Sequence, residues 1–167
     1  KFGALERVSA FVSNQVEGVP VEVRGTLLHR EDLWVLELEA GDAGLRLLNK
    51  DEAKQLSVTS NAPKLLAEST TLRGEIIDPK CYLGAMKPGG GKTHKACAMR
   101  CIAGGIPPML VTRNDGHETF YLLVTADGAA ANEAVLPFVG DQVEVSGHVE
   151  QRADVLILTI NSSIRRQ

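Results

Sequence analysis

An internal repeat that aligns without gaps constrains the fold of this chain more than any other feature. The segment 21–36 aligns on the segment 143–158, and the residues Val, Glu, Val, Gly, Arg, Asp and a final Leu recur at matching positions. Each copy alternates β-branched residues with others, carries a glycine inside its first strand (Gly25 and Gly147) and then has a polar turn. Such a pattern predicts a β-hairpin, and a glycine inside a strand is typical of the sharp bends that small closed barrels require.

The order of the predicted elements indicates the kind of barrel. We expect strands, short helices and irregular segments in the order 20–30 (strand), 33–39 (strand), 43–48 (strand), 50–68 (helical or irregular, with a short helix over 64–68), 71–78 (strand), an insertion, 109–113 (strand), 118–125 (strand), 128–136 (helix), 141–150 (strand) and 154–161 (strand). From residue 71 onward, this is the order of a five-stranded oligonucleotide/oligosaccharide-binding (OB) barrel.

The sequence therefore predicts a mainly β protein with short helices that is built from OB-like barrel halves. Residues 71–167 form an OB-like half that carries a Cys/His segment at 79–108, and residues 1–70 form an N-terminal β-hairpin or partial OB-like half. The repeat suggests a partial tandem duplication. The alternative is a single mixed β-sandwich with hairpins that resemble each other by convergence.

All three cysteines of the chain fall in one short segment, with a histidine among them. Cys81, His94, Cys97 and Cys101 have the spacing C-x12-H-x2-C-x3-C. Sulfur and imidazole donors at such offsets are typical of a metal or redox site. An odd number of cysteines argues against a small domain held together by disulfides.

A short helix brings three of these four residues together. The segment 94–103 contains no proline or glycine, Thr93 is a plausible N-cap, and the glycines and prolines of 104–108 end the helix. Spacings of three and four residues place His94, Cys97 and Cys101 on one helix face. Cys81 follows the end of a strand, and a glycine-rich loop at 88–91 returns the chain to the helix.

The four residues predict a Cys3His metal site. Tetrahedral zinc suits these ligands best, and an iron–sulfur cluster with one histidine ligand is the alternative. A second interpretation is a thiol-redox protein that uses Cys97 or Cys101 with His94 as base. A third is an OB-type module that binds an oligonucleotide or another ligand.

The charge pattern indicates what surrounds the site. The segment between Asp78 and Asp115 contains no acidic residue but holds six basic ones: Lys80, Lys87, Lys92, Lys95, Arg100 and Arg113. Nearby cations favour thiolates, and they also suit an anionic protein partner at this surface. We expect no nucleic-acid partner, since the net charge is −3 and aromatic residues make up only 4% of the chain. No apolar run approaches the roughly 18 residues of a membrane span.

Two stretches of this chain resemble a group of bacterial proteins of uncharacterised activity. Their pattern is G-x-I-x-D-x-x-C, then a C-A-x-x-C helix and a closing L-P-F-x-G-x-x-V-x-V-x-G hairpin; here it runs from Gly74 to Cys101 and from Leu136 to Gly147. These proteins are generally exported or membrane-anchored OB-like barrels. The resemblance implies a periplasmic or exported location and is compatible with a membrane anchor outside this chain. It does not imply any particular activity.

Taken together, the sequence predicts an accessory metal-binding domain of a larger periplasmic system. Its role would be structural or electron-transferring, and no residue stands in a known catalytic motif. We therefore expect a domain that is not an enzyme by itself.

Overall fold

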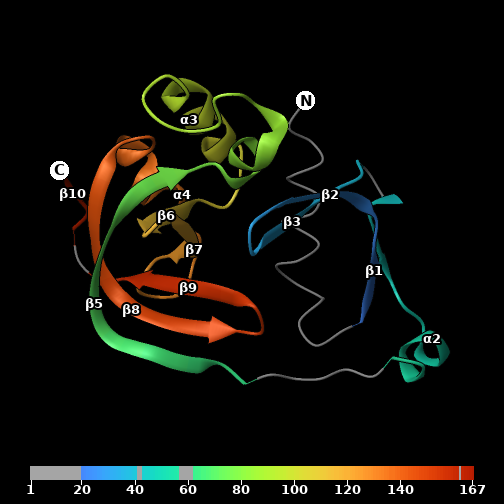
Figure 1. The fold of residues 1–167 in the computed structure, drawn as a ribbon. Helices are drawn as coiled ribbons and strands as arrows, with labels where there is room; N and C mark the ends of the chain where they lie inside the picture. Colours follow the sequence, from blue (N-terminus) through green and yellow to red (C-terminus); the bar gives the residue numbers. More distant parts are fainter. Residues whose placement is uncertain (1–19, 41–42, 57–61, 162) are drawn as a thin grey trace. The chain divides into compact units, whose positions relative to one another are not determined.

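β-Strands dominate the described part of the chain, which a computed structural model gives as residues 20–40, 43–56, 62–161 and 163–167 (Figure 1). The elements are β1 (Val21–Val23), β2 (Gly25–Arg30), β3 (Leu33–Leu38), β4 (Leu45–Leu47), α2 (Lys50–Lys54), β5 (Lys64–Ile77), η2 (Cys81–Ala85), α3 (Lys95–Ala103), β6 (Met109–Asn114), β7 (His117–Val124), α4 (Asn132–Val135), η3 (Leu136–Phe138), β8 (Gln142–Arg152), β9 (Val155–Ile160) and β10 (Arg165–Arg166). They fall into two units: a first unit of residues up to 28 and 34–60, and a second unit of residues 29–33 and 61–167.

Five strands of the second unit close a barrel. Their order is β8-β5-β6-β7-β9, and β9 pairs again with β8. All these pairs are antiparallel except β7 with β9, which run parallel from Tyr121 opposite Leu156 onward. The short helix α4 lies in sequence between the third and fourth barrel strands. This arrangement confirms the predicted mainly β, OB-like barrel.

The two copies of the repeat form hairpins with the same local geometry. A Cβ atom on Gly147 would lie 1.9 Å from the carbonyl oxygen of Thr159, and one on Gly25 would lie 2.1 Å from that of Glu37. Each glycine is therefore needed, because the backbone of the residue twelve positions later in the chain occupies the space that a Cβ atom would take. The described strands before β5 form only two-stranded pairings, β1 with β4 and β2 with β3, so the duplication and the boundary at residue 71 stay predictions.

The short helix predicted over 64–68 is wrong, because these residues begin the long strand β5. Lys64 lies opposite Gln151 and Ala67 opposite Val149 of β8, with register shifts between the paired positions. The local sequence Lys-Leu-Leu-Ala-Glu favours a helix, but pairing with a neighbouring strand decides its conformation. Such irregularities bend a strand. β5 pairs with β8 on both sides of them, and its last residues, 75–77, pair with β6.

Two apolar clusters pack on the sheet of the second unit. The larger joins the strands to the short helices and has these buried members: Ile76, Ala98, Ile102, Leu110, Leu123, Ala131, Val135, Val139, Val143, Val145, Val149, Leu158 and Ile164. The smaller contains Ile77, Tyr82, Met109, Val111 and Phe120. Neighbouring residues such as Ile76 and Ile77 belong to different clusters, as expected for a strand that buries both faces. The insertion after β5 is thus packed on the barrel through both α3 and η2.

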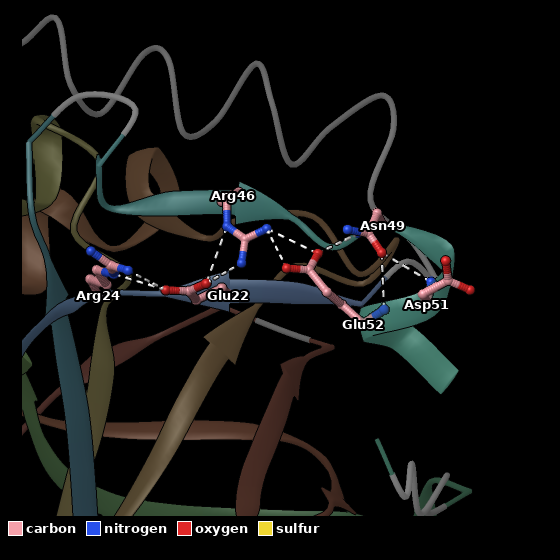
Figure 2. Close-up of polar contacts among 6 residues, drawn as sticks. All are labelled: Glu22, Arg24, Arg46, Asn49, Asp51 and Glu52. Atoms are coloured by element: carbon pink, nitrogen blue, oxygen red, sulfur yellow. Dashed lines mark hydrogen bonds and ion pairs between the residues drawn. The ribbon is translucent and has the colours of Figure 1, made fainter. Parts of the chain in front are cut away.

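An ion-pair network joins the strands and helix of the first unit (Figure 2). Arg46 of β4 pairs with Glu22 of the neighbouring strand β1 and donates to both carboxylate oxygens of Glu52 at 3.0 and 3.1 Å. Glu52 also completes a capping box, in which its side chain accepts from Asn49 N–H and the Asn49 side chain accepts from Glu52 N–H. Arg46 therefore fixes α2 to the strand pair through polar contacts at the surface.

Candidate metal centre

The chemistry-bearing residues of the second unit lie on the insertion between the first and second barrel strands. Asp78 follows the end of β5, and Cys81 is the first residue of η2. His94 is the N-cap residue of α3, whose helical positions include Cys97 and Cys101. One strand end and one helix thus supply five donor side chains.

The helix predicted over 94–103 is confirmed, with its start one residue later. His94, rather than Thr93, takes the N-cap position, and its carbonyl oxygen accepts from the N–H groups of Cys97 and Ala98 at 3.0 Å each. Its backbone is in the right-handed region, and no side chain caps this helix end. The His94 side chain is therefore free of a capping role. The helix ends at Gly104, as predicted.

The three cysteines come together although Cys81 is far from the others in sequence. The Sγ atoms of Cys81, Cys97 and Cys101 all lie within 4.8 Å of one another. Cys81 is buried, and the other two are half-buried. Thiolates bound to one tetrahedral zinc at 2.3 Å are separated by about 3.8 Å. The three sulfurs therefore need only a small movement to bind one ion.

His94 belongs to a second group of donors. One oxygen of Asp78, the sulfur of Cys81 and one imidazole nitrogen of His94 also lie within 4.8 Å of one another. All three residues are buried, with Asp78 0% and His94 5% exposed. The two groups share Cys81. His94 is therefore grouped with Cys81 and Asp78, and not with Cys97 and Cys101.

Two residues of this second group each have a buried atom without a geometrically defined hydrogen-bond partner among the described residues: Oδ2 of Asp78 and Nε2 of His94. A buried polar atom without a partner costs about 1–3 kcal/mol, so such atoms need an explanation. A cation bound near these two atoms would supply that explanation.

Asp78 is the donor that the sequence analysis missed. Its Oδ1 accepts from the N–H groups of Lys80 at 2.9 Å and of Cys81 at 3.4 Å. These two bonds fix the turn into η2, and the second oxygen, Oδ2, takes no part in them. The signal available in the sequence was an aspartate directly after the apolar residues Ile76 and Ile77, three positions before a cysteine. This residue is also the aspartate of the G-x-I-x-D-x-x-C pattern, although the pattern by itself does not mark it as a ligand.

The glycine-rich loop lies against the cysteine, as its predicted role requires. A Cβ atom on Gly89 would lie 2.4 Å from the carbonyl oxygen of Cys81, so only glycine permits this approach. Gly91 N–H donates to the carboxylate of the buried Glu75, and the Gly91 carbonyl accepts from His94 N–H at 3.0 Å. This chain of contacts connects strand β5 to the start of α3 and holds His94 in place.

The surroundings of Cys81 and Cys101 favour the protonated thiols in the absence of a cation. Burial is the largest cause that raises the pKa of Cys81 strongly and that of Cys101 to about 11, and the hydrogen bond to Asp78 and the charge of Asp78 act in the same direction. A bound metal ion would reverse this by replacing the thiol protons.

Ion pairs within the second unit use part of the basic segment. Lys95 pairs with Asp141 at 2.6 Å, and Arg113 pairs with Glu118 at 3.0 Å. Three further basic residues of this segment are exposed: Lys87, Lys92 and Arg100.

Tyr82 covers the outer face of the second and third barrel strands. It packs with the buried residues Val111 of β6 and Phe120 of β7, and its ring meets that of Phe120 edge-on at 6.0 Å between centroids. OB-type barrels use this strand face and the neighbouring loops to bind oligonucleotides. Here Tyr82 of the chain's own insertion packs on that face.

Fold and donors together define an OB-like barrel whose first interstrand insertion presents sulfur, imidazole and carboxylate groups at one place. No family model, no curated protein and no solved structure matches the chain. Within the described residues, none of the helices has the length and apolar character that a membrane crossing requires.

Proposed function

We propose that this chain is an accessory metal-binding domain whose ion is held by Cys81, Cys97 and Cys101, with His94 as the fourth ligand. The observation that carries the proposal is the approach of the three sulfur atoms to within 4.8 Å of one another. The unpartnered His94 Nε2 provides independent support, since a buried imidazole nitrogen without a partner is a free ligand.

Zinc is the metal that this donor set favours. Three thiolates close enough to share one ion suit a tetrahedral zinc site. In a 4Fe–4S cluster each thiolate binds a different iron atom, so the sulfurs lie further apart than at a single zinc ion. An iron–sulfur cluster remains the alternative, and the colour of the purified protein would reveal it.

A structural role follows from where the ligands sit. Cys81 follows the barrel strand β5, and Cys97 and Cys101 belong to α3, whose Ala98 and Ile102 are buried in the larger apolar cluster. An ion that joins these elements would fix the insertion on the barrel. Electron transfer would require a redox-active metal at the same place.

The proposed setting is periplasmic or exported, inside a larger assembly. This rests on the resemblance to exported bacterial proteins. A protein partner with an acidic surface would suit the exposed Lys87, Lys92 and Arg100. Association with such a partner should weaken as salt concentration rises, because exposed charges are screened.

Metal analysis and an absorption spectrum of anaerobically purified protein test the proposal. We expect zinc without colour, and a more than hundredfold lower affinity in Cys97→Ser, because one of the thiolates is lost. Met86→Leu is the matched control, since its exposed sulfur lies outside the donor groups and should leave affinity unchanged. Metal-free protein that binds no added zinc would overturn the proposal.

Thiol-redox chemistry is the second candidate, because the same three thiols lie together. The raised pKa of the Cys101 thiol argues against Cys101 as the nucleophile, since the protonated form is a poor nucleophile. Alkylation of metal-free protein at neutral pH separates the candidates. One cysteine that reacts much faster than the other two would favour redox chemistry.

A further inference from the structure

We infer that the centre holds two divalent metal ions bridged by the thiolate of Cys81. One ion would lie among Cys81, Cys97 and Cys101, and the other among Asp78, Cys81 and His94. The inference rests on the proposed function and deepens it, because it moves His94 from the first ion to a second one.

The spread of the donors is the first argument. There are five donor side chains, whereas a tetrahedral ion takes four. Their ligand atoms form two groups that are each compact within 4.8 Å and that share one sulfur. A shared thiolate allows two ions to sit side by side, as in other centres where metal ions lie about 3.5–4 Å apart.

Charge balance is the second argument. Three thiolates and one carboxylate carry four negative charges, and the neutral imidazole adds none. One divalent ion would leave two negative charges at a site where Asp78 is 0% exposed. Two divalent ions neutralise the set, and burying uncompensated charge is costly.

The unpartnered atoms are the third argument. Asp78 Oδ2 and His94 Nε2 are both buried and both lack a hydrogen-bond partner within the described part of the chain. The residues that bear these two atoms belong to the same group of three, which is where the second ion would sit. The thiols of Cys81 and Cys101 donate to the Asp78 carboxylate only while they are protonated, so an ion on the cysteines alone removes those hydrogen bonds and leaves the carboxylate without them.

Each ion would have three ligands from this chain and one place for a fourth. The first ion lies next to the half-buried Cys97 and Cys101, so water or a donor from a partner can reach it. The second ion is held by three buried residues. Zinc or cobalt at the two places should therefore differ in how fast a chelator removes them, with the first ion leaving faster.

The stoichiometry of metal binding tests the inference. Full-length metal-free protein, kept reduced and anaerobic, is titrated with cobalt(II) or zinc(II), desalted and analysed for metal per chain. We expect two ions per chain in the wild type. Asp78→Asn and His94→Gln should each retain one ion, and the cobalt-bound variants should keep the thiolate-to-cobalt absorption of the cysteine group.

Matched controls come from the turn between β6 and β7. Asp115 and His117 are exposed and outside both donor groups, so Asp115→Asn and His117→Gln should still bind two ions. Circular dichroism checks folding of each variant. If Asp78→Asn does not fold, His94→Gln decides.

The outcomes separate this inference from the proposed function. One ion in the wild type overturns the two-ion centre but leaves the proposed function standing, with His94 as fourth ligand. Two ions retained in both variants would show that the second ion lies elsewhere and also overturn the inference. Failure to bind any ion would overturn both.

Discussion

The two copies of the repeated hairpin have nearly the same sequence pattern but different surroundings. Val145 and Leu158 of the second copy are 0% exposed inside the barrel. The equivalent residues of the first copy, Val23 and Leu36, are 43% and 37% exposed. The alternation of residues along the sequence thus determines that a hairpin forms. Whether the side chains of that hairpin are buried depends on the closure of the five-stranded barrel.

The comparison also extends to chemistry. The second unit contains both donor groups, while the described residues of the first unit contain none. The first unit instead relies on surface ion pairs around Arg46. The following predictions are ordered from the largest expected effect to the smallest.

Metal removal should destabilise the second unit alone. An ion present at a thousand times its dissociation constant adds about 4 kcal/mol to the free energy of unfolding, and a chelator should remove that contribution. Trp34, the chain's single tryptophan, lies in the first unit and reports on it by fluorescence, while circular dichroism reports mainly on the barrel. Equal shifts in both signals on chelation would contradict the assignment of the metal to the second unit.

Matched leucine truncations should separate the two hairpins. Leu158→Ala removes a fully buried side chain from the barrel and should cost about 3 kcal/mol of unfolding free energy. Leu36→Ala, at the equivalent position, should cost less than about 1 kcal/mol, because its side chain is partly exposed. Urea denaturation measures both. Similar losses would mean that the first hairpin is buried by something in solution.

Alanine at the repeated glycines should affect the two copies alike. A Cβ atom would meet a carbonyl oxygen at 1.9 Å in Gly147→Ala and at 2.1 Å in Gly25→Ala. Each should cost about 2 kcal/mol through overpacking. Thr26→Ala, at an exposed neighbouring position, is the control and should be nearly neutral. A neutral Gly25→Ala would show that the first hairpin lacks the strand approach seen here.

The ion pairs should give the smallest effects. Lys95 and Arg166 lower the pKa of Asp141, so this carboxylate stabilises the fold above its ordinary pKa of 3.8 and loses that contribution as the pH falls below it. Thermal melts of Asp141→Asn should show a small decrease at pH 7 that disappears in acid. Arg46→Met should give a similarly small decrease that high salt abolishes. A decrease for Asp141→Asn that persists at low pH would contradict the electrostatic explanation.

Local patterns predicted the hairpins, the order of the barrel strands and the helix that bears Cys97 and Cys101. These features depend on side-chain period, turn residues and helix-ending glycines, all of which are local. The helix expected at 64–68 failed because β8 pairs with these residues from far along the chain. Local preference is weaker than a ladder of strand hydrogen bonds.

The candidate site was only partly predictable for the same reason. Clustering and spacing indicated Cys81, His94, Cys97 and Cys101, but Asp78 was missed because its role depends on where its second oxygen points. The turn that fixes its first oxygen to Lys80 and Cys81 is visible only in three dimensions. The proximity of His94 to Asp78 is likewise set by the loop that Glu75 holds.

The sequence by itself determined the repeated hairpins and the concentration of sulfur and imidazole in one insertion, because periodicity and spacing are properties of neighbouring residues. Only the tertiary structure decided which hairpin is buried and how five donors divide into two groups around Cys81. Burial and ligand geometry depend on contacts between residues that are distant in the chain. The barrel closes over one copy of the hairpin and fixes the strand end and helix that form the centre.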